Sequence, residues 1–439
     1  MAKSPGKGIR RTIAHARRRS IGIVDDLVSI GNHAGMSLSD AADMSFRGIQ
    51  QRMLLTAFAE SFLTTLVERG IYFYTCHTLG FRDRANLLLA LAFGLIYAAT
   101  AAVSHRLAAW RGEKPMLVFV LGVQFGVTIL MAAVPTTATV VAGTIALGGI
   151  YGLKWPLIES YMLAGDTPSQ AVRTVGRFSM AWSSAVPLGL VAAGPLIHAG
   201  PAWLFVAAVL SGIPTVAAVW RLPARPRHLP HDHPEHIPSV TVARWQRLLI
   251  ATRVLMFAGY AQLWVLAALL PGIYTKLGYA VALAAGLSGA LDLSRWLAFW
   301  LFGKWTHWHD RRWPVVAVVI GQPAGFALAY FGGTLAWVLA GELLFGLAAG
   351  LTYYAALYYA MTIQRGAVKA GGGHEGLIGL GFAAGPGITV LGGALGWGAA
   401  GAVSALTVLV VACAVGALAT IEVRWSQRSE SNGRPAHYE

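Results

Sequence analysis

The sequence predicts an all-α integral membrane protein with twelve transmembrane helices in two pseudo-symmetric six-helix bundles. Three observations predict this fold: the composition, the long uncharged segments and the distribution of Lys and Arg. Of 439 residues, 56% are hydrophobic and only 12% are charged, whereas a soluble chain carries about 25% charge. This composition excludes a soluble multidomain enzyme, and it excludes disorder over most of the chain because disordered chains are poor in apolar residues.

The uncharged segments have the lengths of single helices and of helix pairs. A membrane helix needs about 20 mostly apolar residues, and its backbone groups must bond internally because hydrocarbon offers no partners. Long runs that are interrupted by Pro or Gly turns therefore predict two helices each. The predicted spans are residues 53–77, 85–104, 116–134, 138–162, 176–197, 202–220, 248–271, 280–302, 314–332, 335–360, 377–396 and 398–421.

The Lys and Arg residues concentrate in alternate connections between these spans. With a cytoplasmic N-terminus, the inside segments hold 27 of the 34 Lys and Arg residues and the outside loops hold three. Positively charged loops remain in the cytoplasm, so we expect both termini there and place the protein in the plasma (inner) membrane. Topology thus explains the net charge of +15, and nucleic-acid binding is not needed.

The chain divides into two bundles, a linker and two tails. We predict a basic cytoplasmic tail at 1–52, a six-helix bundle at 53–221, a Pro- and His-rich linker at 222–245, a second bundle at 246–421 and a cytoplasmic tail at 422–439. The linker contains four closely spaced histidines. They form either part of a flexible linker or a weak zinc- or nickel-type site, and they are His228, His231, His233 and His236.

Two loci indicate an internal duplication. The basic turn 105–114 after the second span corresponds to 303–312 after the eighth, and residues 152–161 correspond to 350–359, both at an offset of 198 residues. One shared offset at separate loci predicts a repeated six-helix unit. Halves related by an axis along the membrane normal are typical of a large class of transporters.

On these features the chain resembles the major facilitator superfamily over about residues 53–421. The family's turn reads Gly-x-Leu-Ala-Asp-Arg-x-Gly-Arg-Lys, and the two basic turns here keep part of it. The resemblance implies a role in conformational change for the turn residues, whereas the sequence alone is equally compatible with a role in setting topology. The residues are Arg111, Gly112, Lys114, Gly303, Arg311 and Arg312.

Nine charged residues fall within the spans, where a charge costs at least about 2.5–3.5 kcal/mol. Seven lie in spans one, four, seven and ten, which line the central cavity in the resembled family. Asp292 and Arg295 are three residues apart and share a helix face, so we predict a structural ion pair. The predicted substrate and proton pathway comprises Glu60, Glu68, Arg69, Lys154, Glu159, Arg253, Glu342, Trp155, Tyr354 and Tyr358.

Several of these residues allow two interpretations. Glu68 and Glu342 are either proton carriers, because a carboxyl group sheltered from water can titrate near neutral pH, or members of ion pairs. Lys154 either attracts an anionic substrate group or pairs with one of these carboxylates. Glu159 and Arg253 are expected near the inner membrane surface. Tyr354 and Tyr358 form an aromatic face that either stacks on a substrate ring or packs against other helices.

We therefore predict a secondary transporter that moves a small polar or amphipathic solute by alternating access, coupled to protons. We expect a monomer in the lipid bilayer without a cofactor. An enzyme is not predicted, because the chain contains no His-Glu-x-x-His, serine-nucleophile or phosphate-loop motif. The alternative is a non-transporting membrane sensor or assembly partner that uses the His-rich central loop.

Overall fold

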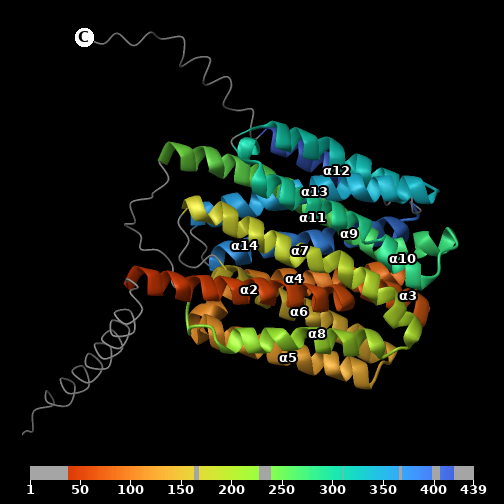
Figure 1. The fold of residues 1–439 in the computed structure, drawn as a ribbon. Coiled ribbons are helices and arrows are strands. Elements are labelled where there is room, and N and C mark those ends of the chain that lie inside the picture. The colour runs from red at the N-terminus through yellow and green to blue at the C-terminus, as the bar shows by residue number, and fades with distance from the viewer. Residues whose placement is uncertain are drawn as a thin grey trace, which may run out of the picture. The chain divides into compact units, whose positions relative to one another are not determined.

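The computed structural model describes residues 38–162, 168–226, 239–309, 311–364, 368–397 and 406–419. The chain forms two units, Met1–Arg52 and Met53–Glu439, and the site described below lies within the second unit. All regular structure in the described residues is helical (Figure 1).

The N-terminal half supplies the first six spanning segments. Its helices are α2 (Leu38–Glu68), α3 (Gly70–Thr78), α4 (Asp83–Arg111), α5 (Glu113–Ala133), α6 (Thr137–Met162), α7 (Pro168–Ala199) and α8 (Trp203–Trp220). The interruption between α2 and α3 is slight. Arg69 keeps helical angles of φ −97° and ψ −44°, and its N–H donates to the carbonyl of Thr65 over 3.1 Å. We therefore treat α2 and α3 as one spanning segment.

The C-terminal half supplies the other six segments. Its helices are α9 (Ser239–Lys276), α10 (Val281–Leu287), α11 (Ala290–Lys304), the short 3-10 helix η1 (Thr306–Trp308), α12 (Trp313–Phe331), α13 (Leu335–Gln364) and α14 (Val368–Ala394), followed by a helix at Leu406–Ala419. The eighth span is divided at Ser288 and Gly289 into α10 and α11.

The predicted twelve-helix membrane fold is confirmed. In the described part of the chain, nine helices are long and apolar enough to cross a membrane; the divided first and eighth segments and the short helix 406–419 make up the rest. Large apolar side chains cover the outside, with Trp220 74% and Phe119 64% exposed, while Lys154 and Asp292 are fully buried. This distribution is the one that a lipid solvent favours, because charges in hydrocarbon are costly.

Two helix boundaries differ from the predictions. Helix α9 begins at Ser239, within the predicted linker, and α14 begins at Val368, nine residues before the predicted span 377–396. The prediction began each span after its polar residues, but both helices begin earlier; in α14 the polar residues His374 and Glu375 are buried against protein. The four linker histidines, residues 228, 231, 233 and 236, lie outside the described residues.

The two halves approach most closely where α4 crosses α14. A Cβ atom on Gly94 of α4 would lie 2.5 Å from the backbone nitrogen of Ala383, and one on Gly379 of α14 would lie 2.6 Å from that of Ala98. These distances leave no room for a side chain. Glycine at both positions lets the backbones of the two halves touch, and the cavity described next lies beside this crossing.

Candidate functional site

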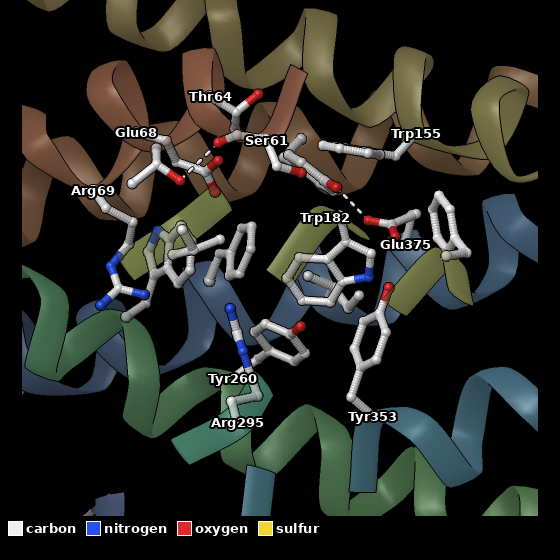
Figure 2. A pocket seen from close by; sticks show the side chains of 17 residues that line it. Ser61, Thr64, Glu68, Arg69, Trp155, Trp182, Tyr260, Arg295, Tyr353 and Glu375 are labelled. Carbon is white, nitrogen blue, oxygen red and sulfur yellow. Dashed lines mark hydrogen bonds between the residues drawn. The ribbon is translucent and has the colours of Figure 1, made fainter. Parts of the chain in front are cut away.

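A cavity of about 90 Å³ lies between the two halves (Figure 2). This volume is several times what one water molecule requires. Eight helices contribute to its walls, four from each half. The lining residues are Ser61, Thr64, Thr65, Glu68, Arg69, Tyr97, Trp155, Phe178, Trp182, Val186, Tyr260, Trp264, Arg295, Tyr353, Glu375, Ile378 and Phe382.

Four charged side chains line the cavity. Glu68 and Arg69 come from the first span, Arg295 from α11 and Glu375 from α14. The sequence predicted Glu68 and Arg69 for this position, and Trp155 lies here as well. Arg295 was predicted only as half of an ion pair. Glu375 was missed because it lies before the predicted start of the eleventh span.

A three-residue ion cluster joins the halves beside the cavity. Arg69 Nη1 lies 3.3 Å from Asp292 Oδ2, and Arg295 Nη2 lies 2.7 Å from Asp292 Oδ1. Asp292 is therefore shared by two arginines, one from each half, and the cluster keeps a net charge of +1. The Arg295 guanidinium also lies 4.9 Å from the ring centroid of Trp182, an arrangement that favours a cation.

Lys154 lies within the N-terminal half and does not line the cavity. Its Nζ donates to Glu60 Oε2 over 2.8 Å, to Gln124 Oε1 over 2.9 Å and to Thr64 Oγ1 over 3.1 Å. Gln124 Nε2 also donates to Glu60 Oε2 over 2.8 Å. Lys154 is thus paired with a carboxylate, as one of its two interpretations expected, but the partner is Glu60 and not Glu68 or Glu342.

Eight of the seventeen residues that line the cavity are aromatic. Trp264 and Phe382 are stacked with ring centroids 3.4 Å apart. Tyr353 lines the cavity, whereas Tyr354 and Tyr358 lie away from it and pack around Trp308 at ring distances of 5.7 and 5.5 Å. Of the two interpretations of Tyr354 and Tyr358, the contacts fit helix packing; Tyr353 reaches the cavity because adjacent helix positions point about 100° apart.

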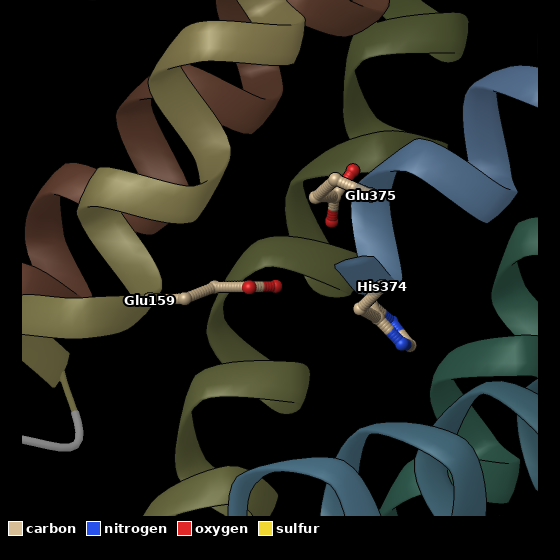
Figure 3. A group of neighbouring side chains, drawn as sticks. All are labelled: Glu159, His374 and Glu375. Atoms are coloured by element: carbon tan, nitrogen blue, oxygen red, sulfur yellow. The ribbon is translucent and has the colours of Figure 1, made fainter. Parts of the chain in front are cut away.

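Two predicted pathway carboxylates are buried away from the cavity. Glu342 is fully buried, and its Oε1 accepts a hydrogen bond from Tyr274 over 2.9 Å. Glu159 is 1% exposed, so it lies inside the protein rather than at the membrane surface as expected. It faces His374 and Glu375 of α14 across the boundary between the halves (Figure 3).

The two other members of this region are Arg253 and Tyr97. Arg253 Nη2 lies 3.8 Å from the position that a Cβ on Gly373 would take, and Arg253 is partly buried. Tyr97 Oη donates a short hydrogen bond to Glu375 Oε2. No role was predicted for His374, Glu375 or Tyr97. The signal for His374 and Glu375 is that they are polar residues directly before an apolar run, and Tyr97 lies within the second predicted span.

The first basic turn makes contacts that hold helix ends together. Lys114 Nζ donates to the carbonyls of Trp220 and Leu222 over 2.8 and 2.7 Å, so it caps the end of α8. Arg111 lies over the ring of Trp110 at 4.1 Å, and Gly112 turns the chain with a φ of +89°, a conformation that favours glycine. These contacts fit carbonyl capping.

The second basic turn connects α11 to α12. A Cβ on Gly303 would lie 3.4 Å from Tyr354 Oη and 3.7 Å from Cα of Gly176 in the other half. Arg311 is exposed after η1, and Arg312 precedes the first residue of α12. Gly303 therefore lies at a contact between the halves.

Comparisons with known proteins identify the fold. No family model matches the chain, and no curated protein does. Among solved structures, the human organic anion transporter MFSD10 (TETRAN) is similar with a TM-score of 0.60 and 16% identity, covering 86% of this chain and 99% of that one. The nucleoside transporter NupG is similar with a TM-score of 0.59 and 14% identity, covering 85% and 99%. A single-residue variant of NupG is similar with a TM-score of 0.61 and 13% identity, covering 85% of this chain and 100% of that one. The chain is therefore an integral membrane protein with the fold of major facilitator superfamily transporters.

Proposed function

We propose that the protein is a secondary transporter that moves a small solute across the plasma (inner) membrane by alternating access, coupled to protons, with both termini in the cytoplasm. One observation carries this proposal: a cavity whose walls come equally from two six-helix halves. A solute held there contacts both halves. Rocking of one half against the other can then expose it to either side of the membrane.

The lining favours a solute that has a planar ring and an anionic group. Trp182, Trp264 and Phe382 supply faces for ring stacking. Within the ion cluster, Asp292 balances only one of the charges on Arg69 and Arg295. A guanidinium binds a carboxylate or phosphate well, so an anionic group would bind at these arginines and not beside the lining carboxylates Glu68 and Glu375. Organic anions and nucleosides, named for the two structural neighbours, are reasonable first candidates.

Glu68 is the proposed proton carrier. Its carboxyl group lines the cavity, and among the described residues no ion pair or hydrogen bond joins it to another side chain. A carboxyl group in this position can take up a proton without breaking a pair. Its charge then changes in the same space that holds the solute, which is what coupling requires.

The experiment separates coupling from binding. Solutes that raise the unfolding temperature of the purified protein are selected from a library of aromatic acids, nucleosides and aliphatic acids. Their uptake into proteoliposomes is then measured with a proton gradient, and their exchange is measured without one. We expect Glu68→Gln to abolish gradient-driven accumulation while exchange continues, because the solute site remains but the proton is lost.

Glu342→Gln is the matched comparison, since this carboxyl group lies away from the cavity. We expect it to retain accumulation. Normal accumulation by Glu68→Gln would show that Glu68 does not carry the proton. Absence of uptake and exchange for every stabilising solute would contradict transport itself.

A further inference from the structure

Three side chains with metal-binding atoms meet at the boundary between the halves. Glu159 comes from α6 of the N-terminal half, and His374 and Glu375 come from α14 of the C-terminal half (Figure 3). One oxygen or nitrogen from each lies within 4.8 Å of the other two. Their exposed fractions are 1%, 0% and 4%, so water does not reach them freely.

In the described part of the chain, the polar side-chain atoms of Glu159 and His374 lack hydrogen-bond partners, whereas Glu375 accepts one hydrogen bond from Tyr97. Among the described residues, neither carboxylate oxygen of Glu159 and neither ring nitrogen of His374 has a hydrogen-bond partner. Buried polar groups almost always have one. A Cβ on Gly371 would lie 2.5 Å from Glu159 Oε2, so the α14 backbone itself closes one side. The cluster is a buried group of three side chains with four unsatisfied atoms.

We propose that Glu159, His374 and Glu375 bind one first-row divalent cation, such as Zn²⁺ or Mn²⁺. Carboxylate oxygens and an imidazole nitrogen are ligands that these ions accept. One cation satisfies atoms of all three residues and neutralises two carboxylates. A single shared proton would join only the two carboxylates and would leave both nitrogens of His374 unpaired.

The groups around the cluster set the expected affinity. Tyr97 Oη faces Glu375, and the Tyr353 ring lies 5.0 Å from the His374 ring. Arg253 is the nearby cation, and its Nε and Nη2 atoms have no hydrogen-bond partner. No ion pair joins Arg253 to either carboxylate among the described residues. Its charge opposes a bound cation, so its removal will tighten binding.

The cation would join α6 to α14 and hence one half to the other. This consequence rests on the proposed transport function, because a tie between the halves matters only if they move. A bound ion would hold this end of the bundle together and slow alternating access. Metal binding itself can be measured without transport, so failure of either proposal is distinguishable from failure of the other.

The test uses the full chain in detergent, stripped of metal, with His228, His231, His233 and His236 all replaced by Ala so that the linker cannot bind. Binding of Co²⁺ is followed by its visible absorption. Binding of Zn²⁺ and Mn²⁺ is then measured by their competition with bound Co²⁺. We expect one Co²⁺ per chain. Glu159→Gln and His374→Gln should each raise the Kd by at least about 100-fold, since even indirect support of a metal ligand is worth on the order of 10- to 100-fold.

Two further variants complete the design. Arg253→Met should lower the Kd several-fold, a change that loss of a merely structural residue would not produce. This test remains valid even if the ligand variants do not fold. His77→Gln, which removes an exposed histidine, should leave the Kd unchanged. Absence of stoichiometric Co²⁺ binding, or binding that survives both Glu159→Gln and His374→Gln in folded protein, would overturn the proposal.

Discussion

Two polar clusters of this protein are similarly buried but differ in how many of their polar atoms have hydrogen-bond partners. The first, Glu60 with Gln124 and Lys154, lies within one half, and Lys154 makes three hydrogen bonds there. The second, Glu159 with His374, lies between the halves, and four of its polar atoms have no partner. Burial alone therefore does not mark a functional charge. A group paired within one half moves with that half, whereas an unpaired group at the boundary is available to a ligand.

The largest change in stability is expected when Lys154 is replaced. Lys154→Met leaves the buried Glu60 carboxylate without its counter-ion, and we expect a loss of about 3–5 kcal/mol in the free energy of unfolding. Thermal or denaturant unfolding in detergent measures it. The double variant Glu60→Gln with Lys154→Met should recover most of the loss. Wild-type stability of the single variant would show that the pair is not a structural element.

A smaller effect is expected at the ion cluster beside the cavity. Arg69→Met removes one partner of Asp292, which keeps Arg295 at 2.7 Å, so we expect a stability loss of about 1–3 kcal/mol. The cavity also loses a positive charge, so an anionic solute should bind at least several-fold more weakly while a neutral analogue is unaffected. Equal weakening of both solutes would contradict the charge argument.

The smallest change in stability is expected at the boundary cluster. With a chelator present, Glu159→Gln removes one of two adjacent carboxylates and so relieves their repulsion. We expect stability to stay within about 1 kcal/mol of wild type or to rise. Measuring the free energy of unfolding of Glu159→Gln and of Lys154→Met under the same conditions compares the two clusters directly. A loss as large as that of Lys154→Met would mean that Glu159 has a structural partner and would remove the distinction between the two clusters.

The fold could be predicted from the sequence because hydropathy depends only on local composition. The uncharged runs located the spans, and the cost of a charge inside a span pointed to Glu68 and Arg69. Pairing depends on how helices are rotated against one another, which no local pattern records. The sequence therefore left open whether Lys154 meets a substrate or one of the carboxylates Glu68 and Glu342, and it did not predict Glu60 as the partner. It also left open whether Tyr354 meets a substrate or packs against other helices. Glu375 and His374 were missed because a polar residue ends an apolar run even when it faces protein.

The most direct test of the central claim measures the distances between the two halves at both ends of the bundle. Spin labels replace exposed residues at one end, in Arg106→Cys with Arg311→Cys, and at the other, in Thr137→Cys with Thr334→Cys, after Cys76 and Cys413 are changed to Ser. Alternating access predicts that a stabilising solute or a change of pH lengthens one distance while it shortens the other. Two distances that stay constant, or that lengthen together, would contradict it.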